Sequence, residues 1–257
     1  MTKFDYKSAM NNIKTSEDFN QNTLDFLSDK ANNSKRNKIK LLKNKYSYGI
    51  IAACLLILFA IYPFLNNTSI PLKNSTGDVS AKYVKNFPKV NINYDLVWLS
   101  EEEIFSKYNT SIFKGQIIDI KNIKIKLGNS SNYKAIAKIK LMETYRGKEK
   151  AGDIIEVLLP CPIDNNVWVE DTGVISKAKV GTVGIFMPIK YDETSIWSEN
   201  NTTLYLSDIC DYGFPDGERF AFLETKNGIS YADFAYESIP KNPSLEDIKK
   251  YILKMIK

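Results

Sequence analysis

The chain has 257 residues, of which 44% are apolar, a composition typical of a protein with a packed core. Its formal net charge is +5, and the excess lies near the N-terminus: residues 1–45 carry ten Lys/Arg and five Asp/Glu, whereas residues 66–257 carry twenty-five of each. The equal numbers of basic and acidic residues in 66–257 argue against a nucleic-acid binder, which would present a basic stripe on its folded domain. Histidine is absent, which excludes Ser-His-Asp and Cys-His catalysis and removes the commonest nitrogen ligand of zinc.

Residues 1–45 are predicted to form a basic, helical, cytoplasmic segment. Tyr6, Ala9 and Ile13 recur at helical spacing, and Ser16, which is followed by two acidic residues, is typical of a helix N-cap. So short a segment cannot bury a large core by itself. It therefore lies on the membrane surface, stays partly disordered or folds against a protein partner.

Residues 46–65 carry no charged side chain and are predicted to be a transmembrane helix. Twenty residues at about 1.5 Å rise span roughly 30 Å, the thickness of the hydrocarbon core of a bilayer. Seven basic residues precede this run, with no acid after Asp29, and the first basic residue beyond it is Lys73. The positive-inside rule then places the N-terminus in the cytoplasm and the larger C-terminal part outside the cell.

Two alternatives to an uncleaved anchor were weighed. A cleaved signal peptide has a short charged start, not 45 residues with a helical pattern of their own. Residues 51–54 match the pattern of a bacterial lipoprotein cleavage box, but an apolar stretch follows Cys54, where a lipidated cysteine should end the hydrophobic region. We therefore interpret Cys54 as a small residue inside the membrane span.

The N-terminal pattern is Tyr6-Lys7-x-Ala9-x-x-x-Ile13-Lys14-x-Ser16-x-x-Phe19-x-x-x-Thr23-Leu24, followed by a basic stretch and a single span. This pattern resembles membrane-anchored anti-sigma-factor-like proteins of Gram-positive bacteria. The resemblance implies a cytoplasmic segment that holds a sigma factor and an outer domain that senses a signal. The chain lacks the His and paired Cys of the zinc-binding type, so a zinc-free variety is implied. The alternative is a plain anchor.

Residues 66–94, rich in Asn, Ser and Lys, are predicted to be a linker or stalk, and residues 95–257 to be a β-rich domain. Ser100 followed by Glu103 forms a capping-box pattern that predicts a short helix. Alternation of apolar and polar side chains, or short apolar runs between turn residues, predicts strands in six regions: 111–122, 133–145, 154–159, 181–187, 219–223 and 228–234.

Residues 100–160 carry a second resemblance. The order is a helix, the strand Phe113-Lys114-Gly115-Gln116-Ile117-Ile118, a long alternating strand, Tyr145-Arg146-Gly147-Lys148, a Gly152-Asp153 turn and an apolar strand. This order is similar to the OB-type barrel of netrin-like domains. It implies a mainly β fold, a small barrel with flanking helices, that acts as a binding or sensing module without a fixed catalytic set.

Residues 244–257 are predicted to be an amphipathic helix with Ser244 as its N-cap. Packing against the barrel is the favoured interpretation for its apolar stripe, and contact with the membrane surface is the alternative.

Cys161 and Cys210 are the only cysteines outside the predicted span. An oxidising exterior permits a disulfide between them, and two buried free thiols are the alternative. Trp168 follows two asparagines and is the best of the three tryptophans for lining a ligand groove, although core packing is the default for each. We expect no cofactor, no metal site and no catalytic residue.

Two further patterns were interpreted as lacking a special role. Asp208, Asp211, Asp216 and Glu218 form an acidic loop, but the ligand spacing of a calcium loop is missing, so a solvated turn is favoured. The Ser131–Lys134 spacing matches that of penicillin-binding enzymes, but the companion motifs are absent.

The anchor and the two resemblances together predict three partners: the membrane, a protein bound by the cytoplasmic segment and an extracellular ligand.

Overall fold

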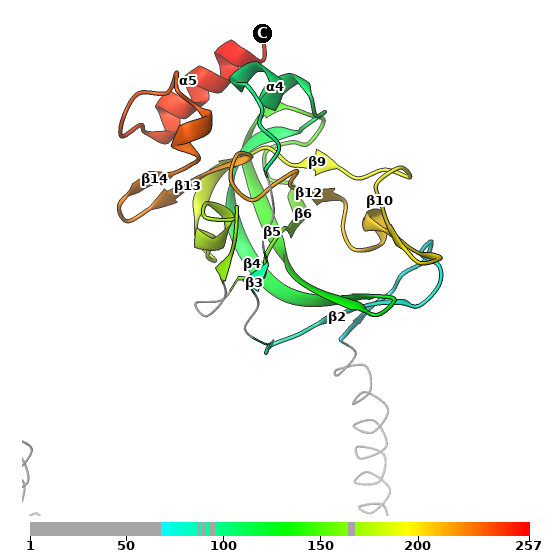
Figure 1. The fold of residues 1–257 in the computed structure, drawn as a ribbon. Helices are drawn as coiled ribbons and strands as arrows, with labels where there is room; N and C mark the ends of the chain where they lie inside the picture. Colours follow the sequence, from blue (N-terminus) through cyan, green and yellow to red (C-terminus); the bar gives the residue numbers. More distant parts are fainter. Residues whose placement is uncertain (1–67, 87, 89–90, 93–95, 164–167) are drawn as a thin grey trace, which may run out of the picture. The chain divides into compact units, whose positions relative to one another are not determined.

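The computed structural model describes residues 68–86, 88, 91–92, 96–163 and 168–257, which are mainly β (Figure 1). The chain divides into two compact units, and the described residues belong to the unit 67–257. The cytoplasmic segment predicted for residues 1–45 and the transmembrane helix predicted for residues 46–65 lie outside the described residues. Of the helices that are described, none has the length and apolar character needed to cross a bilayer.

Two strands of the described part are long: β4 (Ile112–Leu127) and β5 (Ser130–Arg146). The shorter strands are β1 (Ser69–Ile70), β2 (Val79–Tyr83), β3 (Asn91–Ile92), β6 (Ile154–Leu159), β7 (Trp168–Val169), β8 (Val183–Phe186), β9 (Ile189–Lys190), β10 (Ile196–Glu199), β11 (Thr202–Tyr205), β12 (Tyr212–Gly213), β13 (Ala221–Thr225) and β14 (Gly228–Ser230). The helical elements are α4 (Glu101–Ser106), α5 (Leu245–Met255) and the 3-10 turns η1 (Ile175–Lys177), η2 (Leu206–Asp208) and η3 (Asp233–Ala235).

Ten strands form one curled sheet with the order β14-β13-β8-β4-β5-β6-β12-β9, to which β2 and β1 are added beside β4. β12 pairs with β6 in parallel, and β13 pairs with β8 antiparallel. These two strands lie near opposite ends of the order, yet they are consecutive in the chain and only residues 214–220 separate them. The sheet therefore curls on itself, and we call residues 214–220 the closing loop.

The curl depends on β4, which changes partner along its length. Its first half pairs with β8 and its second half with β2, while β5 runs along its other edge with three register shifts. Gly115 lies in the first half, where a Cβ atom would stand 2.7 Å from Ile139 Cγ2 and 2.9 Å from the Lys140 carbonyl oxygen. Any larger residue would force β4 and β5 apart, so glycine is required there.

The sheet has a hydrophobic cluster on each face. Ala135, Ala137 and Ile139 of β5 belong to the larger cluster, which includes the apolar sides of α4 and α5. Ile136 points to the other face and belongs to a smaller cluster with Leu158, with residues of β1, β2 and β4, and with Leu204 from the β10–β11 hairpin. The first half of β5 is therefore covered on both faces.

Both predicted helices are confirmed, together with their N-caps. Ser100 and Ser244 each accept a hydrogen bond from the backbone N–H three residues on, and Glu103 and Asp247 complete the two capping boxes. The helices pack side by side at one end of the sheet, where the Tyr251 hydroxyl donates to Glu101 at 2.7 Å (Figure 1). Leu245, Ile248 and Ile252 of α5 are buried in the larger cluster, which confirms packing against the sheet.

The structure differs from the prediction for residues 66–94, which were expected to be a linker. β2 pairs with the second half of β4 over five residues, and β1 pairs with β2. The sequence of β2, Val-Ser-Ala-Lys-Tyr, buries only the small Ala81 fully, so its pattern is weak and the pairing partner determines its structure. The strand predicted over 228–234 ends at Ser230, and η3 follows it.

Candidate ligand-binding site

A cavity of about 230 Å³ lies where several turns meet at one side of the sheet. It is bounded by β5, by the chain after β6, β7 and β9, by Leu96 and by the start of the closing loop. The residues that line it are Leu96, Lys134, Leu158, Pro160, Asp171, Thr172, Tyr191, Phe214, Pro215, Asp216 and Gly217. We refer to it as the Lys134 pocket.

Lys134 reaches this cavity because of its position on β5. It is opposite Ile123 of β4 and points to the same face as Ile136, which is the face covered by the smaller hydrophobic cluster. Its Nζ donates to the Pro160 carbonyl oxygen at 3.3 Å and lies 5.7 Å from the centre of the Trp197 ring. Burial of the amine lowers the pKa of Lys134, since an apolar surrounding disfavours its charged form.

No acidic side chain of the described residues forms an ion pair with this amine. Among the ion pairs of the described residues none includes Lys134, and the only charge that favours its ammonium form is a thiolate at Cys161. Lys138, four residues further along the same face, is paired with Glu156 at 3.0 Å in a solvent-exposed position. The two lysines therefore lie on the same strand and the same face, but Lys138 is exposed and paired with an acid, whereas Lys134 lines a cavity and has no acidic partner among the described residues.

Tyr191 supplies a second polar group to the cavity. Its backbone N–H donates to the Asp211 carbonyl oxygen at 2.8 Å, which fixes it beside β12, and its ring lies against Gly213. A Cβ atom at Gly213 would stand 1.7 Å from the Tyr191 hydroxyl oxygen, so the glycine makes room for the phenol. Burial raises the pKa of Tyr191, and its hydroxyl has no hydrogen-bond partner within the part of the chain that the structure describes.

Cys161 and Cys210 are both free and buried, so the predicted disulfide is not present. Cys161 belongs to the larger cluster and Cys210 to the smaller one, on the other face of the sheet, which explains why they do not bond to each other. Burial raises the pKa of Cys161 to about 11 and that of Cys210 to about 12. Neither is a thiolate at neutral pH, so neither neutralises Lys134.

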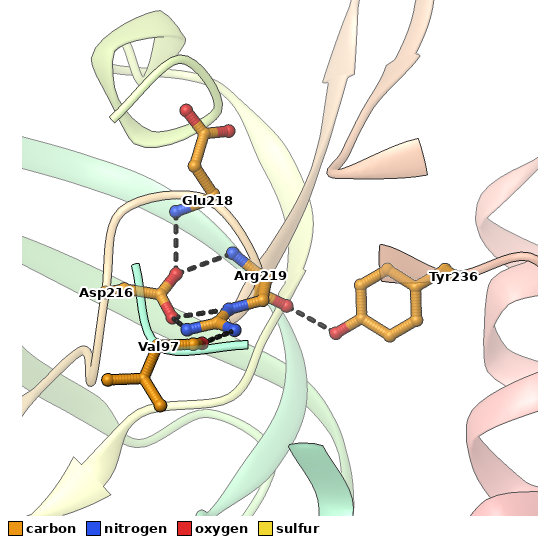
Figure 2. A network of polar contacts seen from close by, with 5 residues as sticks. All are labelled: Val97, Asp216, Glu218, Arg219 and Tyr236. Carbon is orange, nitrogen blue, oxygen red and sulfur yellow. Dashed lines mark hydrogen bonds and ion pairs between the residues drawn. The ribbon is translucent and has the colours of Figure 1, made fainter. Parts of the chain in front are cut away.

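The closing loop is fixed by a buried ion pair, shown in Figure 2. Arg219 Nε and Nη2 both lie 2.8 Å from Asp216 Oδ2, and Asp216 Oδ1 accepts from the backbone N–H groups of Glu218 and Arg219 at 2.9 and 2.8 Å. Arg219 Nη1 donates to the Val97 carbonyl oxygen at 2.7 Å, and the Tyr236 hydroxyl donates to the Arg219 carbonyl oxygen. This network holds the segment before α4 on the closing loop, and Leu96 of that segment lines the Lys134 pocket.

The acidic loop considered as a calcium site is dispersed in the structure. The Asp208 carboxylate accepts hydrogen bonds from Asn74 and Ser75, Asp216 pairs with Arg219, and Glu218 accepts from the Gly173 N–H. Within the described ranges, no group of three or more His, Cys, Asp or Glu side chains is arranged to hold a metal ion. Each of these three carboxylates therefore forms hydrogen bonds with a different segment of the chain and does not face the other two.

Trp168, the tryptophan preferred as a groove residue, lies in β7, which pairs with β3; its side chain is outside the described residues. Trp197 is the tryptophan that contacts the Lys134 amine. Ser131 and Lys134 are an odd number of residues apart on β5, so they point to opposite faces and cannot form a serine–lysine pair. Lys134 was predicted only as part of a chance serine–lysine spacing, and no sequence pattern marks Tyr191 as a site residue.

Comparison of the chain with protein-family models, with curated proteins and with solved structures finds no match.

Proposed function

We propose that this chain is a single-pass membrane regulator, in which residues 95–257 form an extracytoplasmic sensing domain and residues 1–45 bind a sigma-type factor. The uncharged run at 46–65 and the seven basic residues before it support the anchor and its orientation. The spacing of the first 24 residues supports the anti-sigma-like role.

The observation that carries the sensing role is the Lys134 pocket. A small cavity with mostly apolar walls and a few convergent polar groups is the usual form of a small-molecule site. Here the lining side chains with polar groups are Lys134, Asp171, Thr172, Tyr191 and Asp216, of which Asp216 is already paired with Arg219. Lys134 Nζ has up to three N–H donors and makes one hydrogen bond within the described residues, so it can also donate to a ligand.

We also propose that the curled sheet is an OB-type barrel of the netrin-like kind. The support is a curled sheet in which the long strand β4 pairs with β8 along its first half, with β2 along its second half and with β5 along its other edge. The helix before β4 and the C-terminal helix pack together, so they flank the barrel as expected.

The regulator role is tested with the full-length chain in cells. The protein, carrying a C-terminal tag, is crosslinked and purified, and its partners are identified by mass spectrometry. Recovery of a sigma-type factor with the full chain, and its loss on deletion of residues 1–28, supports the proposal. If the deletion leaves the set of partners and the cellular response unchanged, the N-terminus is only an anchor and the chain is a surface-displayed binding protein.

A further inference from the structure

We propose that the Lys134 pocket binds a small organic anion with one carboxylate, whose charge pairs with the Lys134 ammonium and whose apolar part lies against Leu158 and Phe214. This inference rests on the proposed function in that it takes this pocket as the sensing site.

The surroundings of the Lys134 amine favour a negatively charged ligand. Within the described ranges, the contacts of Lys134 Nζ are a carbonyl oxygen and the face of the Trp197 ring, both of which attract a cation without neutralising it. Taking an ammonium group out of water without an acidic partner is costly, and an anion at the cavity would supply that partner. A charged ligand is therefore favoured over an uncharged ligand of the same shape.

The number of donors favours a carboxylate over a phosphate group. The cavity offers the Lys134 ammonium and the Tyr191 hydroxyl, which together can donate to the two oxygens of a carboxylate. Phosphate groups are usually held by several donors, often an arginine fork. The nearest arginine, Arg219, is occupied by Asp216 and by the Val97 carbonyl oxygen, so it is not available to a ligand.

The size of the cavity and its remaining charge also limit the ligand. A volume of about 230 Å³ is below the usual range of drug-sized sites, so the ligand is a small molecule. Leu96, Leu158, Pro160 and Phe214 provide apolar walls for its body. Asp171 also lines the cavity and disfavours a second negative charge on the ligand, since like charges in such a site repel.

The experiment uses the full-length chain in lipid nanodiscs and ligand-observed NMR. The probes are three carboxylates (propionate, butyrate and benzoate), their uncharged amides (propionamide, butyramide and benzamide), and inorganic phosphate. We expect at least one carboxylate to bind at least about tenfold more tightly than its amide, which corresponds to one charge-assisted hydrogen bond. We also expect its affinity to fall as the pH rises, because binding favours the protonated amine.

Three variants locate the binding. K134M should weaken carboxylate binding at least about tenfold and abolish its preference over the amide. Y191F, which is conservative and keeps the ring, should weaken it by less. K138M is the matched control: it removes an equal charge from the same face of β5, at a lysine that is paired with Glu156 and does not line the cavity. The affinity of the K138M variant for the carboxylates should equal that of the unmodified chain.

Several results would overturn the inference: equal binding of the carboxylates and amides, preference for phosphate, equal loss in K134M and K138M, or no binding of any probe. These outcomes are separable from failure of the proposed function. Binding of the amides, lost when Tyr191 is changed but not when Lys134 is changed, would keep a small-molecule sensor and reject the anion. The recovery of a sigma-type factor by residues 1–28 is measured without any probe and fails or succeeds independently.

Discussion

Arg219 is a buried cation and Lys134 is a half-buried one that lines the Lys134 pocket, and the two differ in their partners. Arg219 has a carboxylate, Asp216, and a carbonyl oxygen within 2.8 Å, so its donors are satisfied within the protein. Lys134 has a carbonyl oxygen at 3.3 Å and an aromatic ring. Arg219 therefore stabilises the fold, whereas Lys134 is available to a ligand. Substitutions at and around the two residues can distinguish these roles.

The largest effect is expected for R219M. The substitution leaves Asp216 buried without its cation and releases the Val97 carbonyl oxygen, so the free energy of unfolding should fall by about 3–5 kcal/mol. The measurement is urea unfolding followed by tryptophan fluorescence. K126M is the control, because it breaks the exposed pair with Asp78, in which both side chains are at least 45% exposed, and should cost less than about 1 kcal/mol. Equal effects of the two substitutions would show that the buried pair is not a structural element.

A smaller effect is expected for Y236F, which keeps the buried ring and removes the hydrogen bond to the Arg219 carbonyl oxygen. The unfolding free energy should fall by about 1–2 kcal/mol, since a buried acceptor is left unsatisfied. Y108F is the comparison, as the Tyr108 ring packs on Phe220 and its hydroxyl makes no hydrogen bond within the described residues. A neutral result for Y236F would place the stability of the network in the ion pair alone.

The opposite sign is expected for K134M in the absence of ligand. Methionine keeps most of the length and apolar volume and removes a desolvated amine, so the unfolding free energy should rise by about 1 kcal/mol. Thermal and urea unfolding at pH 7 measure it. K138M, which breaks an exposed pair, should change stability by less. A loss of stability in K134M would mean that Lys134 is a structural residue, like Arg219.

The last effect is a dependence of stability on pH. Because the pKa of Lys134 is lowered in the folded state below its ordinary value of about 10.4, the unfolded chain binds more protons in the interval between the two values. The contribution of Lys134 to stability therefore rises with pH through that interval, by at most about 1.4 kcal/mol per pH unit. The measurement is urea unfolding of the unmodified chain and of K134M between pH 7 and pH 10. The difference between the two slopes of unfolding free energy against pH gives the contribution of Lys134. Parallel slopes would contradict a buried amine.

Local patterns predicted the elements whose structure depends on their own residues. The capping boxes at Ser100 and Ser244 were recognised in the sequence, since a cap needs only residues three apart. The alternation over 133–145 predicted β5, and the apolar run 154–159 predicted β6 with the bounds that the structure has. The three short strands of 66–94 were not predicted; β2, for example, pairs with residues of β4 that lie 40 to 48 positions further along the chain.

The candidate site could not be found in the same way. By the alternation of β5, Lys134 lies on the same face as Lys138, which is solvent-exposed. At Lys134 that face is covered by the β10–β11 hairpin and by Tyr191, which follow it by more than 50 residues. Asp216 was noted as an acid, but its pairing with Arg219 three residues on was not predicted, because only the folded closing loop buries both.

The closing loop has a consequence for how the chain acquires its structure during synthesis. β6 and β8 each have one edge that is covered only by the segment containing β12 and β13. Until the ribosome has added residues 212–225, both edges present unpaired backbone groups, which are the usual sites of intermolecular strand addition. A chain in which this segment has not yet paired is therefore prone to aggregation, and its dependence on chaperones should be sensitive to changes in residues 212–225.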